Sequence, residues 1–226
     1  MARIPKRIHL IYNTPELPEK YHTYFESIKS FHPSWEIKIY GDDEAKDIIA
    51  GNMPELAGVY NGYTLDVQRT DIFRLAIVYL RGGFYMDLDM LCLKRLDQLC
   101  DQRLVLGEEK TFSDQECIAL GTPHRLRIAN YMFGAMPHHP FWLDVIKEAI
   151  TRSGMRIRKE TDVIDSTGPA LLTDVYHSVK HKYGGSTILF NEDKKCMKWC
   201  DTISCHFGEF AAHFHLGSWR WEATHA

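Results

Sequence analysis

The chain has 226 residues, of which 45% are hydrophobic and 25% charged, and its net charge at pH 7 is -3. This length suits one domain with a sizeable core. The slightly acidic balance gives no electrostatic basis for binding nucleic acid. We therefore expect residues 1–226 to form a single domain and exclude nucleic acid as a partner.

The N-terminal stretch MARIPKRIHLIYN contains only a short apolar run, from Ile8 to Tyr12. Such a run is too short for a secretory signal or a membrane span. We expect a cytoplasmic protein, with peripheral association at the inner face of a membrane left open. Cysteines in a chain without an export signal indicate reduced thiols rather than a disulfide framework. The six are Cys92, Cys100, Cys117, Cys196, Cys200 and Cys205.

Hydrophobic periodicity predicts alternating strands and helices along the first half of the chain. Residues 7–12 and 35–41 alternate as strands, and residues 15–33 between them have helical spacing. Residues 64–83 form the clearest helix, with Gly82 as its C-terminal cap. The next segment, GGFYMDLDM (82–90), has the composition of a buried strand. This order of elements is typical of an α/β domain.

The second half of the chain continues the pattern. Strands are predicted at residues 91–96, 103–109, 128–136 and 186–190, and helices at residues 139–153 and 168–185. Residues 153–167 show no clear periodicity. We expect them to form a solvated, mobile connection, with an acceptor-binding lid as the alternative.

Two carboxylates interrupt the apolar segment that follows the clearest helix. In a strand, Asp87 and Asp89 would share one face while Met86 and Leu88 pack on the other. Two close, buried carboxylates repel each other unless a proton, a donor or a cation lies between them. Mg²⁺ and Mn²⁺ prefer such oxygen ligands. A metal site is therefore one interpretation, and an exposed edge with two solvated aspartates is the other.

Neighbouring residues favour the metal site. Asp71 and Arg74 lie on one face of the preceding helix, although a surface ion pair would also explain them. Near the C-terminus, His215 and Ser218 lie three residues apart beside a glycine. They are candidates for a further metal ligand and a phosphate contact, while a core histidine is the simpler account of His215 alone.

Four segments, taken in chain order, resemble a known family. IPKRIHLIYN resembles the family's opening I-P-K-x-I-H-x-I-W, and DIFRLAIVYLRGGFYMDLDM resembles its D-x-x-R, double-glycine and D-x-D core. STGPALLT resembles a later T-G-P element, and HLGSW resembles the terminal histidine and Ser-Trp. The family is that of the DXD sugar transferases. It includes the yeast initiating α-1,6-mannosyltransferase, bacterial capsule and lipopolysaccharide sugar transferases and, more distantly, the clostridial glucosylating toxins.

The resemblance implies a GT-A fold, a single Rossmann-like nucleotide-sugar-binding domain with a mixed central sheet flanked by helices. It also implies that Asp89 binds Mn²⁺ (or Mg²⁺) directly, that Asp87 contacts ribose, sugar and metal, and that His215 completes the metal shell. Asp71 and Arg74 would bind donor sugar hydroxyls and, with both acids of the D-x-D, make up the catalytic set.

Other positions would complete the donor site by resemblance. Tyr12 stands where the family commonly has Trp and would stack on the base. Ser218 and Trp219 would touch the diphosphate, although Trp219 and Trp221 also suit a core or rim. The donor-binding set implied is Ile11, Tyr12, Asp71, Arg74, Tyr85, Asp87, Ser218 and Trp219.

The function implied is metal-dependent, retaining transfer of a hexose from a nucleotide-diphosphate sugar, with a UDP-sugar favoured and GDP-mannose as an option. The acceptor would be a glycan or lipid-linked hydroxyl in polysaccharide or lipopolysaccharide-type biosynthesis. The alternative is a non-catalytic sugar-nucleotide or glycan-binding protein on the same scaffold.

Two other classes of protein are weighed against this one. A haloacid dehalogenase-type phosphatase also uses Asp-x-Asp, but near the N-terminus and with Thr or Val where this chain has Leu91. A zinc site is suggested by Cys196, Cys200, Cys205 and His206, yet their spacing departs from two tight ligand pairs, which favours ordinary thiols.

Overall fold

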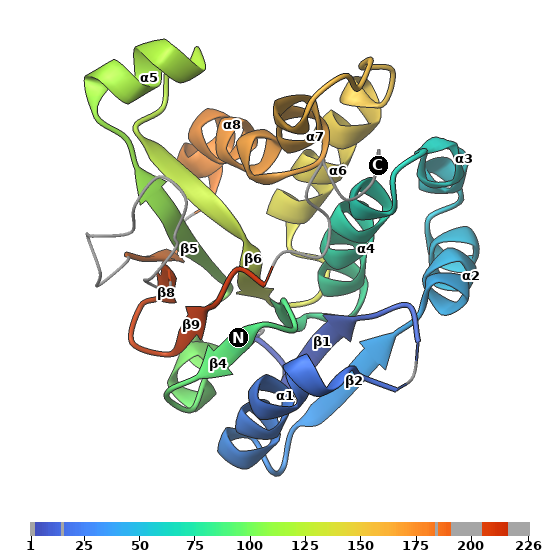
Figure 1. Cartoon of the computed structure of the whole chain (residues 1–226), viewed down its shortest axis with the longest axis vertical. Helices are drawn as coiled ribbons and strands as arrows, with labels where there is room; N and C mark the ends of the chain where they lie inside the picture. Colours follow the sequence, from blue (N-terminus) through green and yellow to red (C-terminus); the bar gives the residue numbers. More distant parts are fainter. Residues whose placement is uncertain (1–2, 15, 184, 191–204, 217–226) are drawn as a thin grey trace.

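The computed structural model describes residues 3–14, 16–183, 185–190 and 205–216. Figure 1 shows the elements in chain order from blue to red. Within the described residues, no helix is both long and apolar enough to cross a membrane. The helices are α1 (Glu19–Phe31), α2 (Asp42–Asn52), α3 (Pro54–Gly62), α4 (Asp66–Arg81), α5 (Asp114–Leu120), α6 (Pro140–Arg152), α7 (Glu160–Ser166) and α8 (Pro169–Val179), with 3-10 turns η1 (Asp97–Asp101) and η2 (Lys180–Lys182).

Two sheets organise the molecule. The larger has the strand order β2 (Glu36–Tyr40), β1 (Arg7–Ile11), β3 (Gly83–Met86), β6 (Leu126–Ala135), β5 (Leu104–Thr111) and β7 (Ser186–Leu189). It is mixed, because β6 runs antiparallel to both β3 and β5 while β1 is parallel to β2 and β3. The smaller sheet is antiparallel, in the order β4 (Met90–Cys92), β9 (Ala211–His213) and β8 (Cys205–Phe207).

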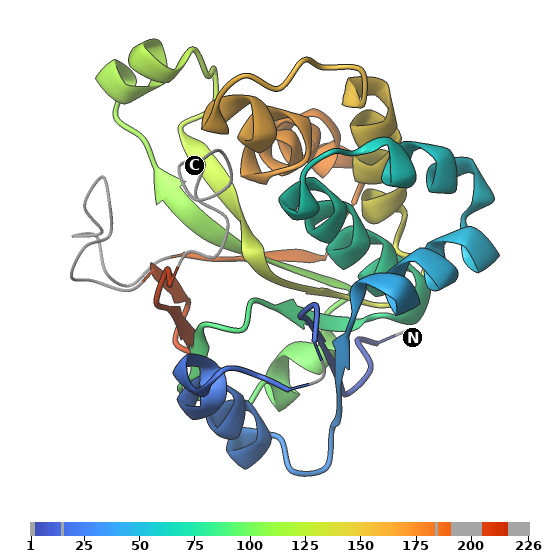
Figure 2. The same cartoon turned by 45° about the vertical axis from the view of Figure 1, so that its right-hand side comes forward.

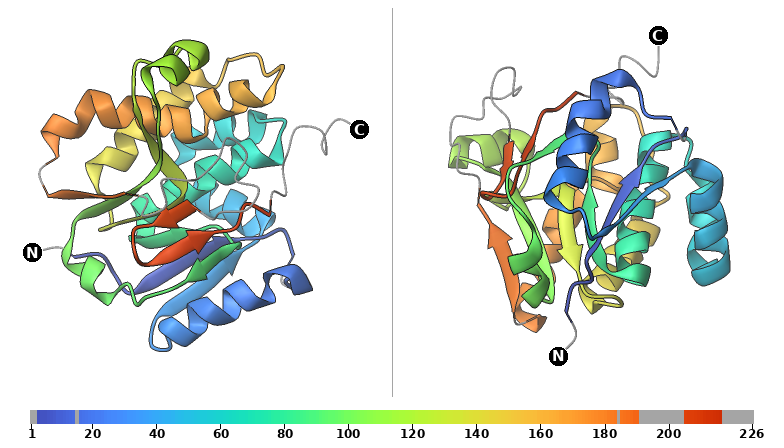
Figure 3. Two further views of the ribbon diagram at one scale, coloured as in Figure 1. Left: turned by 60° about the vertical axis from the view of Figure 1, so that its left-hand side comes forward. Right: turned by 90° about the horizontal axis from the view of Figure 1, so that it is seen from below.

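The large sheet separates two hydrophobic cores. Tyr85 and Phe133 face the core under α2, α3, α4, α6 and α8, whereas Phe84 and Met132 face the core shared with α1, η1 and the small sheet. This alternation follows from the pleat of a strand, which sends successive side chains to opposite faces. Figure 2 shows α1 and the small sheet on the face opposite α4, α6 and α8, and Figure 3 shows the small sheet from two further directions. The predicted α/β architecture with a mixed central sheet is confirmed.

A close approach of the backbone fixes the start of β3. Gly82 caps α4 with φ +62°, and Gly83 has φ +98°. A Cβ on Gly83 would lie 2.6 Å from the carbonyl oxygen of Arg7, so only glycine fits between these strands. The buried imidazole of His9 bridges the same junction, with Nε2 2.8 Å from the Gly82 carbonyl oxygen and Nδ1 3.0 Å from the hydroxyl of Tyr40. This packing sets the direction in which β3 leaves α4.

The structure corrects some of the element predictions. The strand predicted over residues 82–90 ends at Met86, and of residues 91–96 only the first two belong to β4. Residues 153–167 were predicted to be a connection without secondary structure, but Glu160–Ser166 form α7. The backbone N–H groups of Arg158 and Lys159 donate to the Asp162 carboxylate and so cap the N-terminus of this helix. Its seven residues are too few to establish a helical period in the sequence.

Candidate active site

Asp87 and Asp89 lie in a tight turn that ends β3. The N–H of Asp87 donates to the carbonyl oxygen of Tyr131 (2.8 Å), which extends the pairing with β6 by one residue. The N–H of Met90 then donates to the carbonyl oxygen of Asp87 (3.2 Å), so the chain reverses before β4 begins. The two carboxylates are therefore brought together by a turn. The sequence had predicted instead that they would share one face of a strand. Leu88, the residue between them in the sequence, is buried in the hydrophobic core.

The third member of the group is a histidine from β9. Strand β4 pairs with β9 so that Met90 faces His213 across the ladder. This register places Nε2 of His213 3.1 Å from Oδ1 of Asp89 and 3.9 Å from Oδ2 of Asp87. The ligand atoms of the three side chains lie within 4.8 Å of one another. We call Asp87, Asp89 and His213 the acid–histidine cluster.

His215, which the resemblance implied as the histidine ligand, is not a member of this cluster. Its Nε2 is 3.1 Å from Sγ of Cys205, and its ring packs against that of His213 with centroids 4.0 Å apart. The backbone explains why His213 rather than His215 faces the acids. His213 is the last residue of β9, and beyond it the chain turns at His215, where φ is +51°. Two histidines two residues apart were visible in the sequence, but the register of a three-residue strand was not.

A buried guanidinium links the cluster to α4. The Nη2 atom of Arg74 lies 3.3 Å from Oδ1 of Asp71, and its Nη1 lies 3.4 Å from Oδ1 of Asp87 and donates to the carbonyl oxygen of Asn130 (2.7 Å). The guanidinium also lies over the ring of Tyr85 at 4.6 Å. Only 6% of Arg74 is exposed, so these groups replace the hydration of its two terminal nitrogens, while Nε is buried without a hydrogen-bond partner among the described residues. The predicted set of Asp71, Arg74, Tyr85 and Asp87 thus forms one contiguous network.

Two residues outside the predicted set hold Asp71. Thr167 donates its hydroxyl proton to Oδ2 of Asp71 (2.9 Å), and the side-chain amide of Asn130 donates to Oδ1 (3.2 Å). Burial raises the pKa of Asp71 to about 6, although Arg74 and Thr167 both favour the carboxylate. Thr167 belongs to the STGP segment and Asn130 to the strand predicted over residues 128–136, so each had a sequence signal but no assigned role.

The two acids of the turn differ in protonation preference. Burial raises the pKa of the Asp87 carboxyl despite the nearby Arg74, and the hydroxyl of Tyr85 donates to its Oδ1. Burial also acts on Asp89, but His213 and the backbone N–H of Leu216, which donates to Oδ2 (2.8 Å), hold its pKa below the usual value. Asp89 is therefore the carboxylate that stays ionised most readily.

The acid–histidine cluster fits a divalent cation by the chemistry of its donors. Two carboxylates and one imidazole suit Mn²⁺ and related ions, and their ligand atoms converge. The His213 Nδ1 atom is buried without a hydrogen-bond partner among the described residues. A cation between the carboxylates would also relieve their mutual repulsion.

The predicted base-binding residues lie at the end of β1. Tyr12 continues from Ile11 and donates its N–H to the carbonyl oxygen of Tyr40 (3.0 Å), while its half-buried ring packs edge-on against Tyr21 at 5.7 Å. On α1, Tyr24 contacts the exposed ring of Phe214 at 5.3 Å. The predicted diphosphate contacts, Ser218 and Trp219, lie outside the described residues.

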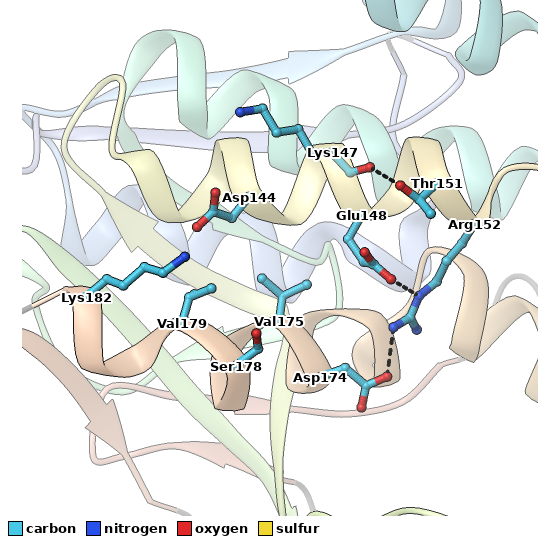
Figure 4. A pocket seen from close by; sticks show the side chains of 10 residues that line it. All are labelled: Asp144, Lys147, Glu148, Thr151, Arg152, Asp174, Val175, Ser178, Val179 and Lys182. Carbon is cyan, nitrogen blue, oxygen red and sulfur yellow. Dashed lines mark hydrogen bonds and ion pairs between the residues drawn. The ribbon is translucent and has the colours of Figure 1, made fainter.

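Two other regions of the molecule were considered as sites: a groove between two helices and the residues suggested for zinc. A groove between α6 and α8 is lined largely by charged side chains, and Arg152 bridges Glu148 and Asp174 within it (Figure 4). No residue of the acid–histidine cluster lines this groove. Of the four residues proposed for zinc, Cys205 and His206 are described, while the other two, Cys196 and Cys200, lie outside the described residues.

The arrangement of the sheet and of this turn matches a known fold. A mixed α/β sheet that ends one central strand in an Asp-x-Asp turn is the arrangement of the GT-A fold, and comparison with solved structures agrees. The structure titled PaToxG Glycosyltransferase superposes with a TM-score of 0.59 at 17% identity, covering 79% of this chain and 71% of that one. The GT-A fold is confirmed.

Sequence comparisons find similarity to glycosyltransferases. Residues 18–106 match the model of the glycosyltransferase sugar-binding region containing DXD motif. Inositol phosphoceramide mannosyltransferase 2 of Schizosaccharomyces pombe is 27% identical over 79% of this chain and 48% of its own length. The initiation-specific alpha-1,6-mannosyltransferase of Candida albicans is 22% identical over 79% of this chain and 52% of its own length. The chain thus spans about half the length of these curated relatives.

Proposed function

We propose that residues 1–226 form one catalytic domain that transfers a hexose, with retention of configuration, from a nucleotide-diphosphate sugar to an acceptor hydroxyl. The observation that supports this most is the junction of the acid–histidine cluster with the Arg74 network: Asp87 belongs to both. The acid–histidine cluster suits a metal-bound diphosphate, and the Arg74 network suits the hydroxyls of a sugar. A donor molecule has both parts.

The donor we favour is GDP-mannose rather than a UDP-sugar. The support is the names of the relatives, several of which are called mannosyltransferases. The acceptor we favour is a hydroxyl of a lipid-linked or glycan headgroup, because the names of three relatives give inositol phosphoceramide. Such an acceptor is compatible with peripheral membrane association.

The side chains of this site have distinct proposed roles. Asp87, Asp89 and His213 would hold Mn²⁺, or Mg²⁺ in its place. When bound, the ion supplies Lewis-acid stabilisation of the charge that develops on the departing diphosphate. Asp71 and Arg74 bind the hydroxyls of the donor sugar. They can orient the sugar because hydrogen bonds with Thr167 and Asn130 hold both side chains in place. The ring of Tyr12 stacks on the nucleotide base.

The bond changes then balance without another co-reactant. The acceptor oxygen forms a bond to the anomeric carbon while the bond from that carbon to the diphosphate oxygen breaks. The proton of the acceptor hydroxyl passes to an oxygen of the leaving diphosphate. Arg74 contributes a fixed positive charge beside the reacting sugar, since its guanidinium is buried among oxygens that keep its pKa above the usual value.

The test is nucleotide release from GDP-mannose, UDP-glucose, UDP-galactose and a CMP-sugar, each with Mn²⁺ or with EDTA. We expect slow, Mn²⁺-dependent hydrolysis of GDP-mannose by the wild-type chain and none by Asp89→Asn. The matched control is Asp43→Asn, because that carboxylate is 99% exposed on α2; it should hydrolyse at the wild-type rate. Release from no donor would contradict the proposal and favour a non-catalytic binding protein. Release from a UDP-sugar alone would contradict the choice of donor.

A further inference from the structure

The segment 213–216 closes around Asp89 from three directions. Nε2 of His213 approaches Oδ1 (3.1 Å), and the backbone N–H of Leu216 donates to Oδ2 (2.8 Å). The backbone N–H of Phe214 donates to the carbonyl oxygen of Asp89 (3.0 Å). Both carboxylate oxygens and the main chain of Asp89 are thus held by three residues of this four-residue segment. We call this segment the Asp89 clasp.

A left-handed backbone conformation at His215 makes the clasp geometrically feasible. In an extended strand, the N–H groups of residues i and i+2 point to the same side but lie about 6.8 Å apart, so they reach different partner residues. Here the N–H groups of Phe214 and Leu216 both reach Asp89, and the residue between them has φ +51°. Non-glycine residues adopt this conformation only at a cost in conformational energy, so other contacts must hold it.

The side chain of His215 supplies such contacts. Its Nε2 lies 3.1 Å from Sγ of Cys205, which is 2% exposed on β8. Its ring packs on that of His213, with centroids 4.0 Å apart, and edge-on toward Tyr131, with centroids 6.5 Å apart. The imidazole is thereby held against Cys205 on β8 and His213 on β9, two strands of the small sheet.

We propose that His215 is a positioning residue that holds the Asp89 clasp through its backbone conformation, rather than a ligand of the cation. This inference rests on the proposed function, because it takes the acid–histidine cluster as the cation site. The clasp keeps Asp89 oriented toward His213, so a clasp that relaxes lowers the affinity for a cation without removing any ligand. Backbone conformation and ligand identity can be separated by substitution.

The test compares two variants of His215 by Mn²⁺ binding to the chain without donor, followed by electron paramagnetic resonance. Both His215→Gly and His215→Val remove the imidazole, but only glycine adopts positive φ freely, and a β-branched residue does so worst. We expect His215→Gly to bind Mn²⁺ within about threefold of wild type and His215→Val to bind at least about tenfold more weakly, in line with the cost of a left-handed residue.

The matched control is His138, the other described non-glycine residue with positive φ (55°), which is not part of the cluster. His138→Val should carry the same backbone strain and leave Mn²⁺ affinity at the wild-type value. Thermal unfolding checks that each variant folds, and His215→Ala replaces His215→Val if the latter does not. Equal loss of affinity in the glycine and valine variants would overturn the proposal in favour of a direct ligand, and wild-type affinity in both would overturn it as well. A wild-type chain that binds no Mn²⁺ would instead contradict the proposed function.

Discussion

Replacing Arg74 with Met tests whether the buried guanidinium is the hub of the site. The side chain neutralises Asp71 at 3.3 Å and Asp87 at 3.4 Å, and only 6% of the residue is exposed. Methionine fills similar space without charge, so the buried carboxylates lose their shared counter-ion. Removing one partner of a buried ion pair costs about 3–5 kcal/mol. With a urea slope of about 3 kcal/mol per molar, the unfolding midpoint should fall by between about 1 and 2 M.

The cost should also depend on pH, and the sign follows from Asp71. Burial raises its folded-state pKa to about 6 from 3.8, so the folded chain binds the proton more tightly than the unfolded chain. Such a group destabilises the fold above its unfolded pKa, and the destabilisation is relieved as pH falls through the folded pKa. Arg74 opposes this shift, as does the hydroxyl of Thr167. The stability lost in Arg74→Met should therefore be larger at pH 8 than at pH 5.

The assay is urea unfolding followed by tryptophan fluorescence, without metal, at both pH values. The matched control is Arg81→Met at the exposed end of the same helix, where the midpoint should change little, since exposed substitutions usually cost less than about 0.5 kcal/mol. In the donor assay, Arg74→Met should lower kcat/KM with little change in the affinity for GDP alone. A loss of stability equal to that of the control, or one that grows toward pH 5, would refute the proposed role of the guanidinium.

Three further predictions follow from residues around the site. The pKa of His9 is lowered by burial to about 4, so its contribution to stability is present above pH 6.5 and lost as pH falls toward 4; the free energy of unfolding of His9→Gln, from urea titrations, should fall less steeply than that of wild type in this window, by up to about 1.4 kcal/mol per pH unit. Gly83→Ala, whose Cβ would meet the backbone of Arg7, should lower the unfolding midpoint far more than Gly121→Ala, which also has positive φ but open space; equal effects would contradict the close approach. Tyr12→Ala should weaken GDP binding in calorimetry by up to about tenfold and Tyr12→Trp should not weaken it, as base stacking requires.

The sequence was informative where a long period or a rigid motif was present. The strands of residues 7–12 and 35–41, the helix ending at Gly82 and the network of Asp71 with Arg74 all occur as predicted, since each depends on local spacing. The positive φ angles at Gly82 and Gly83 could also be anticipated, because few other residues tolerate positive φ.

Other features depend on contacts between distant segments and had no local signal. The seven residues of α7 and the three of β9 are too short for periodicity, and only the pairing of β9 with β4 selects His213 over His215. The two aspartates were expected on a strand face because alternation continues to Leu88. A single hydrogen bond from Met90 to Asp87 closes the turn instead.

The most direct test of the central claim is a calorimetric titration of GDP into the wild-type chain and into Asp89→Asn, each with and without Mn²⁺. If the acid–histidine cluster holds a cation against the donor diphosphate, Mn²⁺ should tighten GDP binding to the wild-type chain and have no effect on the variant. An equal Mn²⁺ enhancement in both proteins would place the cation elsewhere and contradict the assignment of the site.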